Sequence, residues 1–356
     1  MKGLAVVSLL VVLSLCRIAP AAEWAVRSPD GTVVLTVRQD EPGKPLTYSV
    51  ACADAAVLDA SPLGIVRKDA AFDAGLTLES AGEVTSHDST YTTLHGKRKN
   101  VRDHYQTRTL TFRNADGKRV ELHLRAFDDG IAFRYRFPDE NSGTHTVLRE
   151  ATGFHVPADC RVWVQNHDDA GEYTPGYEGY WVNGAPVGTS SPKKAGWAFP
   201  LLFRTPAGRW GLLTEAAVDG SYCGSHLAPE AQDNVYRLRF PEPGEGNNTG
   251  AVEPSGTLPW ATPWRVVIVG TTPGPILEST LVENLNPPCK VADTSWIRPG
   301  RVSWSWLYDP PSPQDFTKLR PFVDLAADMG WEYTLVDANW DIMKNGTIHD
   351  LIAYAK

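Results

Sequence analysis

The stretch from residue 301 to the end constrains the fold most, because its apolar pattern differs from everything before it. Residues 301–306 (RVSWSW) and 333–337 (YTLVD) are typical of buried strands, and residues 312–329 between them form an amphipathic helix. Strand, helix and strand with short connections predict a right-handed βαβ unit with parallel strands. Another helix is predicted from Asp350 to the end. Since a (β/α)8 TIM barrel takes roughly 250 residues, we expect residues 301–356 to be the truncated start of one.

Local signals predict where the first helix begins and ends. Ser312 is a good N-cap, Pro313 suits the first helical position, and Gly330 follows the last turn. Apolar side chains recur on one helix face, at Phe316, Leu319, Phe322, Val323, Ala326 and Met329. This face is predicted to pack on the two strands.

Residues 23–286 carry an almost wholly β pattern. In residues 120–125 (VELHLR) and 131–137 (IAFRYRF), apolar and polar side chains alternate, which is typical of strands with one buried face. Residues 114–117 (NADG) predict a hairpin turn before them. Many short strands predict a large β-sandwich, followed by a linker at 287–300. Residues 241–259 are rich in Gly and Pro, which predicts a long surface loop.

The N-terminus predicts export. Residues 1–22 combine Lys2, an apolar run and small residues before a cleavage point, as in a signal peptide. The apolar run is too short to span a bilayer. Cys16 raises the alternative of a lipoprotein, but Leu15 is larger than such signals favour. We therefore expect an exported, periplasmic protein without a membrane span.

Composition excludes some partners and leaves other questions open. The net charge is −8 with no basic run, which argues against nucleic acid. Twelve Trp and twelve Tyr suit either a core or a sugar-binding cleft, where flat rings stack on pyranoses. After export four cysteines remain, which allow three disulfide pairings or four free thiols: Cys52, Cys160, Cys223 and Cys289. The oligomeric state is left open.

Polar and aromatic residues follow both predicted barrel strands. In a parallel barrel the carboxyl ends of the strands face the active site. Carboxylates there accept hydrogen bonds from sugar hydroxyls, and indole rings stack on sugar rings. We predict as substrate-binding residues Trp304, Trp306, Asp337, Asn339 and Trp340. Asp309 and Asp341 fit solvated loop positions or helix caps better.

A second concentration of acidic and aromatic residues lies at residues 172–181 (EYTPGYEGYW), after 166–169 (NHDD). Hard cations need several oxygen ligands, and this turn-rich loop offers them. It lacks the spacing of an EF-hand, so a solvated acidic loop is the alternative. Glycoside hydrolysis would need two carboxyls roughly 5–9.5 Å apart, and the sequence does not identify such a pair.

The chain resembles glycoside hydrolase family 97. The similar stretches, in the family's order, are residues 28–31 (SPDG), 46–50 (LTYSV), 61–64 (SPLG), 125–136 (RAFDDGIAFRYR), 293–300 (DTSWIRPG), 304–306 (WSW) and 331–337 (WEYTLVD). Together they cover nearly all of the exported chain. The resemblance implies a galactose-mutarotase-like β-super-sandwich, a catalytic (β/α)8 barrel and a small C-terminal β domain.

It also implies an exo-acting, calcium-dependent α-glycosidase that removes terminal glucose or galactose from oligosaccharides. Glu178 resembles the calcium-ligand glutamate that the family's β domain supplies. The other calcium glutamates and the catalytic carboxyls match nothing here, so we expect no catalytic residue and no turnover in this chain. Two alternatives are a stand-alone carbohydrate-binding β-sandwich and a surface scaffold. Sugar specificity and stereochemical course are left open.

Overall fold

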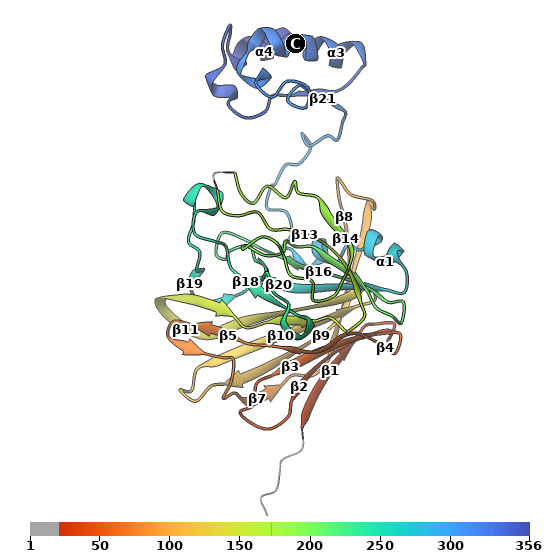
Figure 1. The fold of residues 1–356 in the computed structure, drawn as a ribbon, viewed down its shortest axis with the longest axis vertical. Coiled ribbons are helices and arrows are strands. Elements are labelled where there is room, and N and C mark those ends of the chain that lie inside the picture. The colour runs from red at the N-terminus through yellow and green to blue at the C-terminus, as the bar shows by residue number, and fades with distance from the viewer. Residues whose placement is uncertain (1–20, 172) are drawn as a thin grey trace, which may run out of the picture. The chain divides into compact units, whose positions relative to one another are not determined.

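The computed structural model describes residues 21–171 and 173–356, so the predicted signal peptide lies outside it except for Ala21 and Ala22. The chain divides into two compact units, which are described separately (Figure 1). The first comprises residues up to 91 together with 101–288, and the second comprises 92–100 and 289–356. The predicted domain limits at 23–286, 287–300 and 301–356 stay predictions. No helix in the described part is both long and apolar enough to cross a membrane.

The first layer of the sandwich is a four-stranded antiparallel sheet. Its strands, in spatial and chain order, are β1 (Ala22–Arg27), β2 (Val33–Gln39), β3 (Thr47–Cys52) and β4 (Ala55–Pro62). In β2, Val33, Leu35 and Val37 are fully buried while the residues between them are partly exposed. One apolar face therefore packs against the rest of the molecule.

The second layer is a 13-stranded sheet whose main path runs β14-β13-β15-β16-β20-β11-β10-β9-β7. Strands β5, β6, β8 and β19 attach beside this path. The strands are β5 (Ile65–Arg67), β6 (Ala70–Ala71), β7 (Thr77–Ala81), β8 (Thr85–Thr92), β9 (Asn100–Arg113), β10 (Arg119–Phe127), β11 (Gly130–Glu150), β13 (Arg161–Gln165), β14 (Trp181–Pro186), β15 (Leu201–Arg204), β16 (Trp210–Ala216), β19 (Ser255–Ala261) and β20 (Trp264–Gly270). The hairpin predicted at residues 114–117 is confirmed, because β9 and β10 pair on either side of it.

Smaller elements complete the first unit. A three-stranded sheet has the order β12 (Gly153–His155), β18 (Val235–Arg239) and β17 (His226–Leu227). Two short 3-10 turns are η1 (Gln232–Asn234) and η2 (Glu245–Asn248), and two short helices are α1 (Pro273–Glu278) and α2 (Leu281–Leu285).

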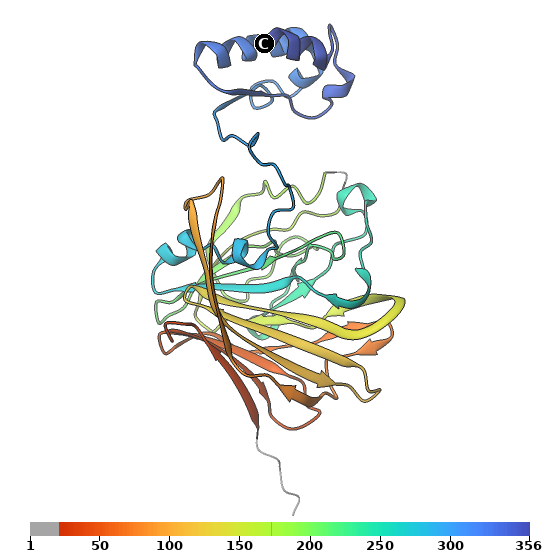
Figure 2. The same ribbon diagram turned by 180° about the vertical axis from the view of Figure 1, so that it is seen from behind.

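The main core lies between the two layers. Tyr48 of β3 packs on Phe133 of β11 with ring centroids 4.7 Å apart, and Trp24 meets Phe112 edge-on at 5.7 Å. The opposite face of the large sheet is covered by α2, whose Leu281 joins a second buried cluster (Figure 2). The predicted β-sandwich is therefore confirmed.

The second unit contains the predicted βαβ arrangement. Strands β21 (Val302–Trp304) and β22 (Tyr333–Leu335) pair in parallel, with α3 (Phe316–Asp328) between them in the chain. The remaining elements are η3 (Ser312–Gln314), η4 (Trp340–Ile342) and α4 (Ile348–Ala355). A small core joins α3 and α4 through Leu319, Val323 and Leu351. The described residues contain two strands of this kind, so a complete barrel stays a prediction.

Three local expectations are corrected or decided. Asp315 caps α3 by accepting from the Thr317 amide, whereas the predicted cap, Ser312, is buried in η3 and donates to Ser305. The loop predicted at 241–259 ends in β19. Among the described strands β19 pairs with β11 alone, so its other edge is free and tolerates Pro259. The four cysteines of the described chain are all free thiols.

Candidate carbohydrate site and metal ligand

The ends of β21 and β22 bring three of the predicted residues together. The Trp304 indole N–H donates to Oδ2 of Asp337 at 2.7 Å. The Trp304 and Trp306 rings stack with centroids 5.9 Å apart and planes 16° from parallel. These contacts form the predicted cluster of aromatic rings beside a carboxylate.

Parallel pairing explains this placement. Trp304 lies opposite Leu335 in the register, so both strands end at the same edge and Asp337 follows closely. The buried Ser303 hydroxyl donates to the Phe322 carbonyl of α3 and is also hydrogen-bonded to the Thr334 hydroxyl of β22. These bonds fix the strand ends against the helix, which gives the indoles a rigid base.

Asn339 and Trp340 lie in the turn that follows β22. Asn339 has a φ of 65°, a left-handed conformation that asparagine adopts more readily than most residues, and it opens η4. Trp340 is half exposed. Asp309 instead forms a surface ion pair with Lys318 at 2.7 Å, as expected for a solvated loop residue.

The side chains at this edge are suited to binding a sugar. Trp304 and Trp306 each expose over a third of their surface, and such rings offer flat apolar faces to a sugar. Asp337 keeps acceptor capacity beyond its bonds to Trp304 and to the Ala338 amide. Hydrolysis would need a second carboxyl opposed to the first.

Glu178 lies in the loop between β13 and β14 of the first unit. The Gln165 side-chain amide donates to the carbonyls of Tyr177, at 3.0 Å, and of Gly179. Asp168 accepts from the amides of Gly176 and Tyr177. The backbone on both sides of Glu178 is thus fixed, while its side chain is exposed to solvent.

Calcium takes six to eight oxygen ligands, so a calcium site at Glu178 would need other ligand side chains close by. Among the described residues, Glu178 belongs to no group of three His, Cys, Asp or Glu side chains close enough to share an ion. The described side chains therefore do not place Glu178 in a cluster of three such ligands. The assignment of Glu178 as a metal ligand stays a prediction.

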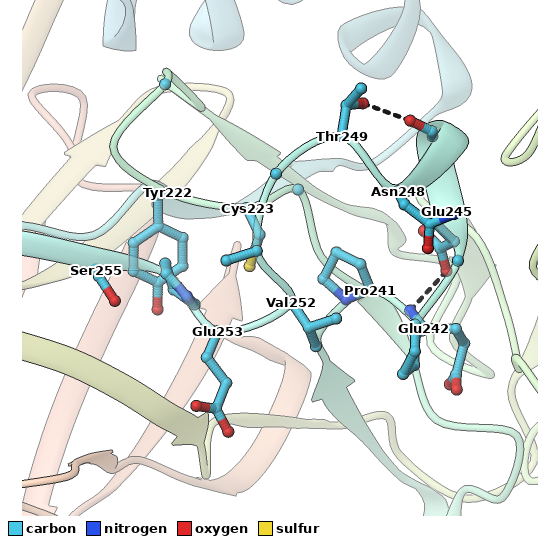
Figure 3. Close-up of a pocket in the computed structure, with 18 of the residues that line it drawn as sticks. Tyr222, Cys223, Pro241, Glu242, Glu245, Asn248, Thr249, Val252, Glu253 and Ser255 are labelled. Atoms are coloured by element: carbon cyan, nitrogen blue, oxygen red, sulfur yellow. Dashed lines mark hydrogen bonds between the residues drawn. The ribbon is translucent and has the colours of Figure 1, made fainter.

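An open pocket of about 680 Å³ lies among loops of the first unit (Figure 3). Its walls are Pro175 and the segments 220–224, 241–246 and 248–255. Burial raises the pKa of the Cys223 thiol to about 12, so this wall residue is neutral near pH 7. The sequence did not predict this pocket, because its walls come from separate stretches of the chain.

With the geometry described, the comparison with known proteins decides the family. Residues 26–288 match the family model "Glycosyl-hydrolase 97 N-terminal". The chain belongs to glycoside hydrolase family 97.

Similar proteins extend this assignment. The family 97 chain is 34% identical to a "Probable retaining alpha-galactosidase" of Streptomyces bingchenggensis, over 87% of this chain and 47% of the relative. It is 24% identical to a "Retaining alpha-galactosidase" of Bacteroides thetaiotaomicron, over 98% and 56% respectively. A solved "beta-arabinopyranosidase" matches with a TM-score of 0.85 and 31% identity, over 93% of this chain and 53% of that one. The chain thus spans about half the length of these relatives.

Another pocket of the described residues was likewise not predicted from the sequence. It measures about 530 Å³ and is lined by Arg125, Arg134, Trp264 and others. Both guanidinium groups lie over the Trp264 ring, at 4.6 and 4.4 Å from its centroid. Burial and then the charge of Arg125 lower the pKa of Arg134 to about 10. Alternation in residues 120–125 and 131–137 places these arginines on the polar face of the predicted strands and does not indicate a pocket.

Proposed function

We propose that this chain is the N-terminal part of an exo-acting retaining α-galactosidase that removes terminal α-linked galactose from oligosaccharides. The observation that carries the proposal is the 34% identity, over 87% of the chain, to a relative described as a "Probable retaining alpha-galactosidase". Because the chain spans about half of that relative's length, we infer that the catalytic carboxyls lie outside residues 1–356. This chain by itself is then inactive.

The strand-end residues are proposed to bind substrate. Trp304 and Trp306 offer their faces to a sugar ring, and Asp337 accepts hydrogen bonds from its hydroxyls. Asn339 and Trp340 extend this surface along the next turn. We further propose that Glu178 supplies one carboxylate to a bound calcium ion whose remaining ligands come from outside this chain. Such an ion would orient the substrate and tune nearby carboxyl pKa values.

Export is part of the proposal. A signal peptide at residues 1–22 would deliver the protein to the periplasm, where oligosaccharides are available. Cleavage before Ala22 would leave β1 intact, since that strand begins at Ala22.

A second candidate is a β-arabinopyranosidase, favoured by the solved structure with a TM-score of 0.85. β-L-Arabinopyranosides have the ring configuration of α-D-galactosides but lack the exocyclic CH₂OH group. A galactose-type site therefore suits both sugars, and the space beyond C5 decides between them.

A substrate panel tests the function. The full-length protein, assayed on nitrophenyl α-galactoside, β-L-arabinopyranoside and α-glucoside, is expected to prefer the galactoside over the glucoside by about 100-fold in kcat/KM. Residues 1–356 alone should show no turnover. NMR of the first-formed product should show the α-anomer, because retaining enzymes use two displacements. A faster reaction with the arabinoside would favour the second candidate, and equal rates on the two hexosides would refute galactose specificity.

A substitution tests the binding role of Asp337. In the full-length protein, Asp337→Asn is expected to raise KM for the galactoside about tenfold, because hydrogen bonds to a charged acceptor are stronger than those to an amide. Asp309→Asn is the matched control, since that carboxylate pairs with Lys318 at the surface. Circular dichroism confirms folding. Equal KM values in the two variants would remove Asp337 from the site.

A further inference from the structure

Two histidines and a glutamate meet beside the Glu178 loop. His167 follows β13, His226 lies in β17, and Glu245 opens η2. One ligand atom from each lies within 4.8 Å of the other two. The His167 Nε2 atom is 3.2 Å from Glu245 Oε1, and the two imidazole rings stack with centroids 3.9 Å apart. Residues 78 positions apart in the chain thus converge on one point.

This cluster is buried and incompletely hydrogen-bonded. The two histidines are 2% and 1% exposed, and the Glu245 side chain is 10% exposed. Among the residues that the structure describes, Nδ1 of His167 and Nε2 of His226 have no hydrogen-bond partner. A buried polar atom without a partner is destabilising, so two of them in one cluster need a physical explanation.

The hydrogen bonding of His226 fits a metal ligand. Its ring is hydrogen-bonded to the backbone of Ala195, and because Nε2 is unpartnered, this bond uses Nδ1. An Nδ1–H donated to a carbonyl leaves a free lone pair on Nε2, the arrangement found in most metal-ligating histidines.

We propose that His167, His226 and Glu245 bind Zn²⁺ or a similar divalent transition metal, with water in the fourth position. Two imidazoles and a carboxylate are a common zinc ligand set, whereas calcium takes oxygen ligands alone. The stacked rings must rotate apart, so that both lone pairs reach the ion at about 2.0–2.1 Å. The site uses neither Glu178 nor the strand-end residues, and it goes beyond the proposed glycosidase function.

The expected role is to hold three chain segments together. Glu245 Oε1 already accepts from the Glu242 amide at 2.8 Å (Figure 3). The next residue, Gly246, donates its amide to the Thr174 carbonyl in the Glu178 loop. The Tyr177 ring of that loop lies 6.0 Å from His167. A metal here would therefore restrain the backbone that carries Glu178.

Zinc titration of the tag-free chain tests the site. After removal of metals with EDTA and dialysis, the protein is expected to bind one Zn²⁺ with micromolar or tighter affinity, measured by mass spectrometry of the metal. Saturating zinc should raise the Tm by about 5 °C, because the ion binds only the folded state. Calcium at the same concentration should leave the Tm unchanged. Stabilisation by calcium instead of zinc would overturn the proposal.

Variants separate this site from adventitious binding. Glu245→Gln and His226→Gln are expected to weaken zinc binding at least about tenfold, since each removes a ligand. Glu242→Gln is the matched control. It changes a carboxylate in the same loop as Glu245, but Glu242 does not belong to the three-residue cluster. If His226→Gln fails to fold, Glu245→Gln and the NMR shifts of the wild-type imidazoles on zinc addition give the same test. Zinc affinity unchanged in Glu245→Gln, or binding only at millimolar zinc, would overturn the proposal.

Discussion

Replacing Glu150 with glutamine is expected to destabilise the β-sandwich by about 3–5 kcal/mol, because it breaks a buried ion pair. Glu150 accepts from Nε and an Nη of Arg265 at 2.9 and 2.6 Å, and neither side chain is exposed to solvent. Glutamine has the same shape but a single acceptor. Its amide N–H₂ would face a guanidinium N–H, leaving two buried donors opposed.

Arg265 cannot escape this loss by deprotonating. Burial alone would lower its pKa, but Glu150 and Glu215 hold the pKa above its usual value. Without Glu150, the cation keeps its bond to Glu215 and one to Ser225, which limits the loss. The pair joins β11 to β20, adjacent strands of the large sheet, so the whole sandwich should unfold more easily.

Thermal unfolding measures the effect. We expect the Tm of Glu150→Gln to fall by roughly 5–15 °C. Asp88→Asn is the matched control: Asp88 also accepts two bonds from one arginine, Arg102, but both side chains are about half exposed. Solvent screens that pair, so its Tm should not change measurably. Similar falls in Tm for the two variants would show that burial of the Glu150–Arg265 pair does not increase its contribution to stability.

Local sequence patterns were sufficient to predict most of the architecture. Alternation in residues 120–125 and 131–137 depends only on neighbouring side chains, and it correctly indicated β10 and the start of β11. The parallel pair β21 and β22 followed from its short connections. β19 was missed because pairing with β11 overrides the turn preference of its Gly and Pro residues.

The candidate sites show which contacts local sequence patterns predict and which they do not. Trp304 and Asp337 were found because a rule about strand ends places them at one edge. The contact of His167 with Glu245 depends on how distant segments pack, and no local pattern encodes that. The same holds for Glu150 and Arg265, which are 115 positions apart.

In the full-length protein, Glu178→Gln is expected to lower kcat/KM for the galactoside about 100-fold, with a matching loss of calcium affinity. A calcium ion depends on charged carboxylates, and an amide oxygen is a weaker ligand. Gln165 and Asp168 fix the backbone around Glu178 without using its side chain, so the variant should keep its fold. A 100-fold loss corresponds to about 2.7 kcal/mol of transition-state stabilisation.

Calcium titration of activity gives the decisive readout. The Glu178→Gln enzyme should need at least about tenfold more calcium for half-maximal rate, and excess calcium should restore part of the activity. Glu83→Gln, which changes an exposed glutamate between β7 and β8, should behave as the wild type. An unchanged calcium requirement in Glu178→Gln would show that this carboxylate does not touch the ion. Rescue by calcium is the result that a merely structural role for Glu178 would not produce.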